Sequence, residues 1–400
     1  MNRYLLILLM VTTITTINPA TADIVSSYDA TYDSNLQKIK VTITIKGGTD
    51  TAYASEYPRD FVILVDNSIS MKDLYREEYK INWIKSSISH LLESMFPYKC
   101  RVSIMSFSDK IKIISPLTFN FELTKKSLEA LSCDGFSSNI GDAIGSATLL
   151  LKERGRDTIP IIIVLTDGGD DKSAIDIKQA VDSARREGIL IYVFSFGNRG
   201  EINEVLLKES AEETGGSYSY APLEMLSEKL GNIVSTTELL SAATIQVAIL
   251  QSKDSIIDHA SIETMVSPGI TLTQKNELEF VCPKISQGEK IEIKFNAFTA
   301  KKGENVSAGN AIVKFIDRNG NVSTLKINPS LKIPSPIPEE VSYAIIAFLF
   351  GLTVLLLYRY ASVKSRIIEL RDDIVSYLKA NKDLTVTEHM IKEIDEKFGR

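Results

Sequence analysis

The sequence has few cysteines, few histidines and no excess of positive charge. Its 400 residues include three cysteines and three histidines, and 45 Lys and Arg stand against 51 Asp and Glu, for a net charge of −6. Three cysteines are too few for a disulfide-stapled scaffold, so packing must supply the core. The scattered His90, His259 and His389 argue against a zinc site or a Ser-His-Asp triad. The acidic balance argues against nucleic-acid binding.

Glycine-rich phosphate-binding motifs are also missing. No G-x-G-x-x-G follows the first predicted α/β strand, and no G-x-x-x-x-G-K-[ST] occurs anywhere. Both absences argue against a nucleotide-binding protein. The chain does have 44% hydrophobic and 24% charged residues, a composition typical of a globular protein with two or three folded units.

Residues 1–22 have the features of a secretory signal peptide. Arg3 precedes a short apolar run at 4–10, and Ala20-Thr21-Ala22 is a small-x-small sequence of the kind that signal peptidase accepts. We therefore expect cleavage before Asp23. An uncleaved anchor and a buried strand are the alternatives.

A membrane span is predicted at residues 341–358, which carry no charge. As a helix these residues rise about 27 Å, enough to cross the hydrocarbon layer. A Pro-rich linker at 332–340 precedes the span, and Arg359, Lys364 and Arg366 follow it. The basic flank predicts a single-pass cell-membrane protein with an extracellular or periplasmic N-terminal part and a cytoplasmic tail at 359–400. A buried soluble helix is the alternative.

Residues 58–240 alternate between apolar strand-like runs and helical periodicity. Strands are expected at 61–65, 101–107, 111–114, 159–165, 190–196 and 217–220, and helices at 123–132, 140–151, 173–187, 201–214 and 223–239 among others. Strands that are apolar throughout are typical of a parallel sheet covered on both faces. The pattern predicts a doubly wound, mostly parallel α/β domain.

The segments on either side of this domain are β-patterned. Residues 241–331 contain alternating runs and an Asn319-Gly320 hairpin signal, and residues 23–57 contain an alternating run at 39–45. We expect 241–331 to form a β-sandwich-like domain. The N-terminal segment is a candidate part of the same sandwich, which the α/β domain would then interrupt.

The cytoplasmic tail is predicted to be helical. Ile367, Leu370, Ile374 and Leu378 fall on one stripe of a helix, and a second short helix is expected after it. Such a stripe usually contacts a partner or a neighbouring helix. We interpret the tail, with the span, as a candidate interaction segment.

Oxygen-bearing side chains gather where three predicted loops meet the sheet. Asp66-Asn67-Ser68-Ile69-Ser70 follows the first α/β strand, the loop 135–141 contains Ser137 and Ser138, and Thr166-Asp167-Gly168 ends the strand at 159–165. Open α/β sheets bind ligands at the carboxyl ends of their strands. Short Ser and Asp side chains on rigid strand ends suit Mg²⁺, which prefers octahedral oxygen ligands.

These three segments resemble the von Willebrand factor A family and its metal-ion-dependent adhesion site, over about residues 58–240. The resemblance implies a divalent-metal site made by Asp66, Ser68, Ser70, Ser138 and Asp167, with Mg²⁺, Mn²⁺ or Ca²⁺ as the ion. Ser138 stands where the family usually has Thr, and Ser137 is a possible substitute. It also implies cell-surface adhesion or protein recognition, in which an acidic residue of a protein partner completes the coordination of the ion.

Other interpretations of these residues remain open. Ser and Asp at strand ends often only cap the next helix, as Ser70 or Asp66 could do. We expect Asp170 and Asp171 to lie in a helix N-terminal turn and to interact favourably with the helix dipole. A haloacid dehalogenase-like phosphotransferase would need an acid/base Asp where Ser68 stands, so no enzymatic reaction is predicted. A structural or assembly scaffold, in which the ion only staples the loops, is the third possibility.

Two further chemical features are predicted outside the metal site. Asn305-Val306-Ser307 and Asn321-Val322-Ser323 are acceptor sequences for N-glycosylation. Cys100 and Cys133 are expected at opposite edges of the sheet, about 20 Å apart. We therefore predict no disulfide between them, since a bridge needs Cα atoms within about 7 Å.

Overall fold

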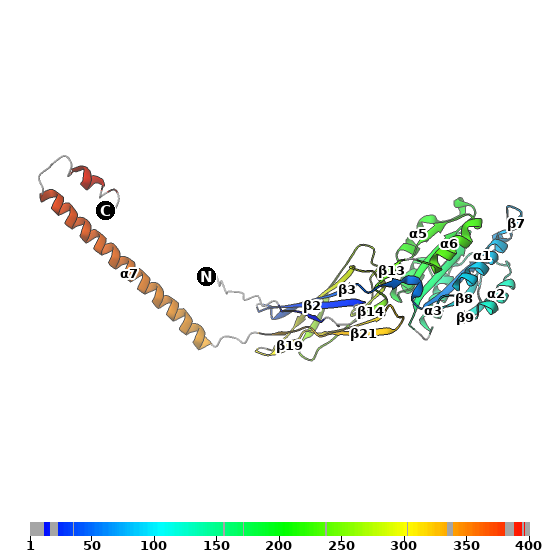
Figure 1. Cartoon of the computed structure of the whole chain (residues 1–400), viewed down its shortest axis with the longest axis horizontal. Coiled ribbons are helices and arrows are strands. Elements are labelled where there is room, and N and C mark those ends of the chain that lie inside the picture. The colour runs from blue at the N-terminus through cyan, green and yellow to red at the C-terminus, as the bar shows by residue number, and fades with distance from the viewer. Residues whose placement is uncertain are drawn as a thin grey trace. The chain divides into compact units, whose positions relative to one another are not determined.

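A computed structural model of the chain describes residues 12–16, 23–34, 36–154, 157–170, 172–236, 238–301, 303–333, 339–380, 388–393 and 396. The chain forms two compact units, Met1–Ile333 and Pro334–Arg400. The first unit contains an α/β part and a strand-rich part, and the second contains one long helix (Figure 1).

The α/β part is built on a six-stranded sheet with the order β12-β11-β10-β5-β8-β9. Neighbouring strands are parallel except for the β8–β9 pair. Every residue of the central strands β5 and β10 is buried, as expected for a sheet covered on both faces. The predicted doubly wound, mostly parallel fold is confirmed. The strands are β5 (Arg59–Asp66), β8 (Cys100–Phe107), β9 (Ile111–Thr118), β10 (Ile159–Thr166), β11 (Leu190–Ser195) and β12 (Tyr218–Tyr220).

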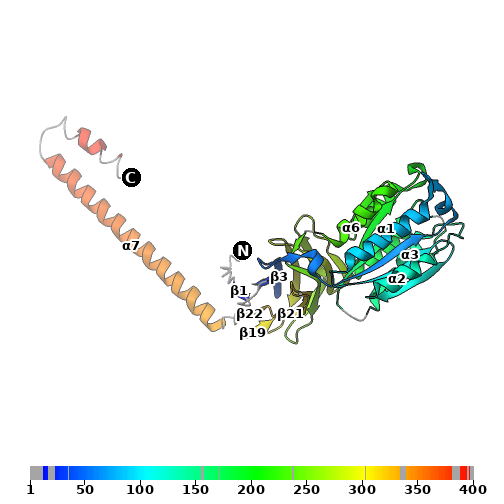
Figure 2. The same cartoon turned by 45° about the vertical axis from the view of Figure 1, so that its right-hand side comes forward.

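Two helical layers cover this sheet. Alternate residues of β5 point to opposite faces, so Phe61, Ile63 and Val65 share one hydrophobic core while Val62 and Leu64 share another. The helices α1 (Lys80–Met95), α2 (Phe121–Glu129) and α6 (Leu226–Val234) contribute to the first core. The helices α3 (Ile140–Lys152), α4 (Ile177–Arg186) and α5 (Glu204–Glu212) contribute to the second. Figure 2 shows α1 and α6 side by side, in agreement with the contacts between them.

Several helices begin later than the hydrophobic periodicity predicts. The predicted helix at 173–187 begins at Ile177, because the Asp176 side chain accepts a hydrogen bond from the Lys178 backbone N–H (3.1 Å). The predicted helix at 201–214 begins at Glu204, where Asn203 caps Leu206 N–H (3.2 Å). Side-chain caps of this kind fix a helix start more sharply than periodicity does.

The strand-rich part consists of two five-stranded sheets with antiparallel pairing. One has the order β1-β2-β3-β18-β15 and contains β2 (Ile24–Asp33), β3 (Lys38–Gly47), β15 (Ile256–Val266) and β18 (Lys290–Phe298). The other has the order β16-β17-β14-β20-β21, with β14 (Ala242–Leu250), β16 (Thr273–Asn276), β17 (Glu279–Ile285), β20 (Asn310–Ile316) and β21 (Val322–Ile327). Side chains of both sheets share one hydrophobic core, which makes the part a sandwich.

Segments that precede and follow the α/β part pair directly in this sandwich. β3 pairs with β18 from Lys38↔Phe298 to Lys46↔Lys290. The N-terminal β segment therefore shares a sheet with strands from the region 241–331. Short elements complete this unit: β4 (Ala52–Tyr53) with β13 (Leu239–Leu240), β6 (Leu74–Tyr75) with β7 (Glu78–Tyr79), β19 (Asn305–Ser307) with β22 (Ser330–Lys332), and the 3₁₀ turns Ala54–Glu56, Ile69–Lys72, Arg199–Glu201 and Leu223–Met225.

A strand also lies within the predicted signal peptide. β1 (Thr12–Thr16) pairs with the outer edge of β2, from Thr12↔Ala30 to Thr16↔Ser26. The rest of the segment 1–22, including the Ala20-Thr21-Ala22 sequence, lies outside the described residues. Cleavage before Asp23 stays a prediction.

The second unit contains the helix α7 (Glu339–Ala380). Its segment Tyr343–Tyr377 is long enough, and contains a stretch apolar enough, to cross a membrane. The helix continues well beyond the predicted span at 341–358 and includes the stripe residues Ile367, Leu370 and Ile374. Residues 388–393 are helical again. The Pro residues of the predicted linker, Pro334, Pro336 and Pro338, lie outside the described residues.

Candidate metal site

The three predicted loops meet at one edge of the α/β sheet. Asp66 is the last residue of β5, and Asp167 directly follows β10, its parallel neighbour. In the sheet, β8 lies on one side of β5 and β10, which comes later in the sequence, lies on the other side. The site therefore lies at a topological switch point, where open α/β sheets form their ligand-binding crevices.

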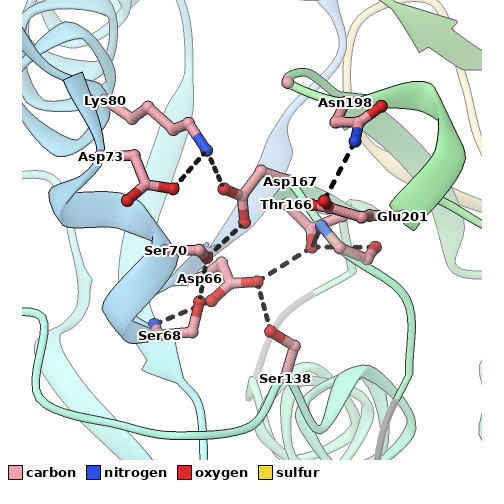
Figure 3. A network of polar contacts seen from close by, with 12 residues as sticks. Asp66, Ser68, Ser70, Asp73, Lys80, Ser138, Thr166, Asp167, Asn198 and Glu201 are labelled. Carbon is pink, nitrogen blue, oxygen red and sulfur yellow. Dashed lines mark hydrogen bonds and ion pairs between the residues drawn. The ribbon is translucent and has the colours of Figure 1, made fainter. Parts of the chain in front are cut away.

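Asp66 is the centre of a hydrogen-bond network (Figure 3). Its Oδ2 atom accepts hydrogen bonds from Ser138 Oγ and Thr166 Oγ1, each at 2.9 Å. Its Oδ1 atom accepts one from the Ser68 backbone N–H, also at 2.9 Å. Both carboxylate oxygens are thus held by groups from three different segments.

The two serines of the first loop connect Asp66 to Asp167. Ser68 Oγ and Ser70 Oγ share a hydrogen bond of 2.9 Å, and Ser70 Oγ donates to Asp167 Oδ1 at 2.9 Å. The structure therefore brings together all five residues predicted from the sequence, namely Asp66, Ser68, Ser70, Ser138 and Asp167. Their side chains provide two carboxylates and three hydroxyls.

The neighbouring hydroxyls of Ser137 and Ser138 point to different partners. Ser138 Oγ donates to Asp66, whereas Ser137 Oγ donates to Asp109 Oδ1 at 2.6 Å. Asp109 Oδ2 also accepts from the Phe136 backbone N–H at 3.0 Å. Of the two serines, Ser138 contacts the Asp66 network, while Ser137 and Asp109 hold the loop in place.

Backbone contacts join the first two loops. Ser68 and Gly135 form an isolated parallel bridge, and Ile69 N–H donates to the Gly135 carbonyl at 2.8 Å. A Cβ at position 135 would lie 2.1 Å from Ser108 Cβ. Glycine is therefore required at position 135 because Ser108, which follows β8, lies directly against it.

Burial makes the Asp66 carboxylate costly to ionise. Desolvation raises the pKa of Asp66 to about 6, hydrogen bonds from Ser68 and Ser138 oppose this rise, and the charge of Asp167 adds to it. A buried carboxylate in this state is stabilised by a nearby cation. The electrostatics of the site thus favour a positive ion beside Asp66.

Three residues of this region have contacts that were not predicted from the sequence. Thr166 donates to Asp66, and Asp109 positions the Ser138 loop. Lys80 Nζ donates to Asp167 Oδ2 at 2.7 Å and lies 3.4 Å from Asp73 Oδ2. Thr166 stands inside the Thr166-Asp167-Gly168 motif, so its contact with Asp66 was predictable from the sequence. Asp109 and Lys80 come from separate segments, and nothing in their spacing predicts these contacts.

Asp170 bonds to a different helix from the one predicted. Its Oδ1 atom accepts from Gly141 N–H at 3.1 Å, in the first turn of α3, and from Ser173 Oγ at 2.5 Å. The expected interaction with the helix that follows Asp170 is wrong, because α4 begins only at Ile177 and is capped by Asp176. Asp171 lies outside the described residues.

The donor set of the site consists of oxygen atoms alone. Among the described residues, no group of three or more His, Cys, Asp and Glu side chains is arranged to hold a metal. The Asp66 network instead combines two carboxylates with serine hydroxyls. Oxygen donors of this kind fit a hard cation such as Mg²⁺, Mn²⁺ or Ca²⁺.

The remaining predicted positions lie away from this site. Asn305 begins β19 and Asn321 directly precedes β21, and both are exposed. Cys133 and Cys282 are buried free thiols, and the thiol of buried Cys100 donates to the Met95 carbonyl oxygen at 3.6 Å. These thiol environments agree with the prediction that Cys100 and Cys133 do not pair.

A doubly wound sheet with an oxygen-lined site at its switch point defines a class of α/β ligand-binding domains. Residues 60–236 match the sequence model of the von Willebrand factor type A domain. The α/β part of the chain is therefore a von Willebrand factor type A domain, as its motifs predict.

The chain is also similar to solved structures from other organisms. A von Willebrand factor type A protein from Catenulispora acidiphila is 14% identical, with 80% of this chain and 76% of that chain covered and a TM-score of 0.46. The pilus adhesin SpaC from Lactobacillus rhamnosus GG is 11% identical, with 80% and 49% covered and a TM-score of 0.38. Proximal thread matrix protein 1 from the mussel byssus, described with a zinc-occupied MIDAS motif, is 16% identical, with 46% of each chain covered and a TM-score of 0.40. The match thus spans about half the length of the last two proteins.

Proposed function

We propose that the α/β domain binds Mg²⁺, or Mn²⁺ or Ca²⁺ in its place, and uses the ion to recognise an acidic residue of a protein partner at the cell surface. The residues that would bind the ion are Asp66, Ser68, Ser70, Ser138 and Asp167. The observation that carries this proposal is the connected network of two carboxylates and three hydroxyls at the switch point of the sheet.

The charge of the donor set supports recognition by the ion. Serine hydroxyls bring no charge, so only Asp66 and Asp167 offset the charge of a divalent ion. An ion held mainly by neutral oxygen atoms retains its attraction for a further anionic ligand. A carboxylate of a partner protein has the charge and the oxygen chemistry to occupy that coordination position.

Exposed apolar side chains beside the site support a protein as the ligand. Ile69, which lies between Ser68 and Ser70, is 52% exposed, and Phe136, two residues before Ser138, is 79% exposed. Large exposed apolar side chains at a polar site are typical of protein-binding surfaces.

Membrane anchorage by α7 completes the proposal. The segment Tyr343–Tyr377 contains a stretch apolar enough to cross a membrane, and the basic residues Arg359, Lys364 and Arg366 support a cytoplasmic C-terminal side. The α/β domain and the sandwich would then lie outside the cell or in the periplasm, where a second protein or surface is accessible. The tail and the span are candidate contacts for a cytoplasmic or membrane partner.

The proposal is tested by capture of partners from native membranes with the full-length protein and a chemical crosslinker. We expect a partner that is recovered by the wild type in Mg²⁺ and lost both with EDTA and with Asp66→Ala. Ser137→Ala is the matched control, because Ser137 bonds to Asp109 outside the network, and it should retain the partner. A partner that is retained equally by Asp66→Ala would contradict the proposal.

A scaffold role is the second candidate, because the same network already ties three loops together. If the ion only holds these loops together, EDTA should strongly lower the thermal stability of the domain and expose its core. For recognition, EDTA should abolish partner binding while the folded state persists. Circular dichroism of the protein with and without EDTA distinguishes the two roles.

A further inference from the structure

Lys80 brings a largely buried ammonium group against the candidate metal site. Its Nζ atom lies 2.7 Å from Asp167 Oδ2, and the two side chains are 13% and 3% exposed. Its second acidic neighbour, Asp73, lies 3.4 Å away and is 67% exposed. The strong interaction of Lys80 is therefore with Asp167, because an exposed carboxylate is screened by water.

The position of Lys80 in its helix is unfavourable for helix stability. Lys80 is the first residue of α1, and no side chain caps this helix at Tyr79. A positive charge at a helix N-terminus is repelled by the helix dipole. The contact with Asp167 offsets this cost. The presence of a lysine at position 80 is therefore explained by its contact with the site and not by the stability of its helix.

The loop after β11 encloses the Lys80–Asp167 pair. Gly197 in this loop has a φ of +93°, and a Cβ there would lie 3.8 Å from Lys80 Nζ and 3.4 Å from Asp167 Cβ. The ammonium group is thus fixed against one oxygen of Asp167, while the other oxygen accepts from Ser70. Figure 3 shows Lys80 reaching Asp167 from the side opposite Asp66 and Ser138.

We propose that Lys80 is a specificity-determining residue. Its fixed positive charge cancels the charge of Asp167 and weakens the binding of divalent ions. It also keeps the ion-loaded site positive, so that the site attracts an acidic partner. This inference rests on the proposed metal-dependent recognition. Asp66, Asp167 and Lys80 together leave one negative charge in the site, so a divalent ion makes the loaded site positive. Without Lys80 the loaded site would be neutral and would attract a carboxylate less.

The first test measures metal affinity by calorimetric titration of the full-length protein in detergent with MgCl₂ or MnCl₂. Lys80→Met removes the charge and keeps an unbranched side chain. We expect it to tighten divalent binding about ten-fold, because a nearby positive charge repels the ion. Lys72→Met is the matched control: it removes a positive charge from an exposed lysine close to Ser70 in the sequence and should change the affinity less than about two-fold.

The second test measures the attraction for a carboxylate. Acetate is titrated into the Mn²⁺-loaded protein, and water-proton relaxation reports the displacement of water from the ion. We expect acetate to bind several-fold more weakly to Lys80→Met than to the wild type. This loss would accompany the gain in metal affinity, which general damage to the site could not produce.

The outcomes separate this inference from the proposed function. If the wild type binds Mn²⁺ and Lys80→Met binds it with equal affinity, the role of Lys80 is overturned and the metal site stands. If neither protein binds a divalent ion, the proposed function and the inference both fail. If the melting temperature shows that Lys80→Met does not fold, Lys80→Gln, which is also neutral, takes its place in both titrations.

Discussion

At the scale of single residues, Ser138 and Ser137 offer a direct comparison. Ser138 Oγ contacts Asp66, whereas Ser137 Oγ, one residue earlier, contacts Asp109. We expect Ser138→Ala to lower the Mg²⁺ affinity about ten-fold, because it removes an oxygen from the site. Ser137→Ala should have a much smaller effect, since it only loosens the loop. Calorimetric titration of both variants checks this prediction, and a larger loss with Ser137→Ala would contradict it.

The short side chains of the site were predictable from the sequence, whereas the long side chain of Lys80 was not. Asp66, Ser68 and Ser70 follow a buried strand at fixed spacing, so the strand itself places them at the sheet edge. Lys80 reaches Asp167 across 87 positions of the chain. The contact depends on how α1 packs over the sheet and on the side-chain rotamer, and neither leaves a periodic signal in the sequence.

At the scale of elements, Glu187 connects the α/β part to the sandwich. Glu187, at the C-terminal end of α4, contacts Lys152 of α3 at 3.1 Å and Lys275 of β16 at 2.8 Å. Burial raises the pKa of Glu187, but the hydrogen bonds from the two lysines outweigh this effect and hold the pKa below its usual value. Because the pKa is lower in the folded state, the contribution to stability is present above the unfolded value and is lost as the pH falls through the folded value.

We therefore expect a pH-dependent coupling between Glu187 and Lys275. A double-mutant cycle with Glu187→Gln and Lys275→Ala should give about 0.5 to 1 kcal/mol at pH 7, a small value because the lysine is partly exposed. The coupling should be lost as the pH falls below the ordinary glutamate value of 4.5 and through the lower folded value. Urea unfolding followed by the fluorescence of Trp83, the single tryptophan, measures it. A coupling that is unchanged at low pH would rule out an ionic origin.

Strands that are buried along their whole length were predictable from the sequence, whereas helix starts and strand partners were less predictable. β5 and β10 are buried along their whole length, and their apolar sequences identified them as inner strands of a parallel sheet. The starts of α4 and α5 depend on the caps Asp176 and Asn203 and were misplaced. The pairing of β3 with β18 joins segments more than two hundred positions apart, and alternation alone does not specify a partner strand.

At the scale of the whole molecule, the predicted topology has the residues before the span at 341–358 outside the cytoplasm and the tail at 359–400 inside it. Lys253 of the first unit and Ser365 of α7 are both exposed. We expect a membrane-impermeant maleimide to label Lys253→Cys in intact cells, and to label Ser365→Cys only after permeabilisation. Labelling of position 365 in intact cells would contradict the predicted orientation.

The native thiols provide a low background for this measurement. Burial raises the pKa of Cys133 to about 11 and that of Cys282 to about 12. Cys100 is also buried, with its thiol against the Met95 carbonyl. Since the thiolate is the reactive form, these residues should react slowly at neutral pH, and the wild-type protein is the control.

The central claim is that the oxygen atoms around Asp66 bind a divalent ion. Titration calorimetry of the purified full-length protein with MgCl₂ and MnCl₂ tests this claim most directly. We predict binding of one ion per chain for the wild type, and no binding heat for Asp66→Ala under conditions where its circular dichroism shows a folded protein. Absence of binding heat in the wild type, or equal heat in the two proteins, would contradict the account.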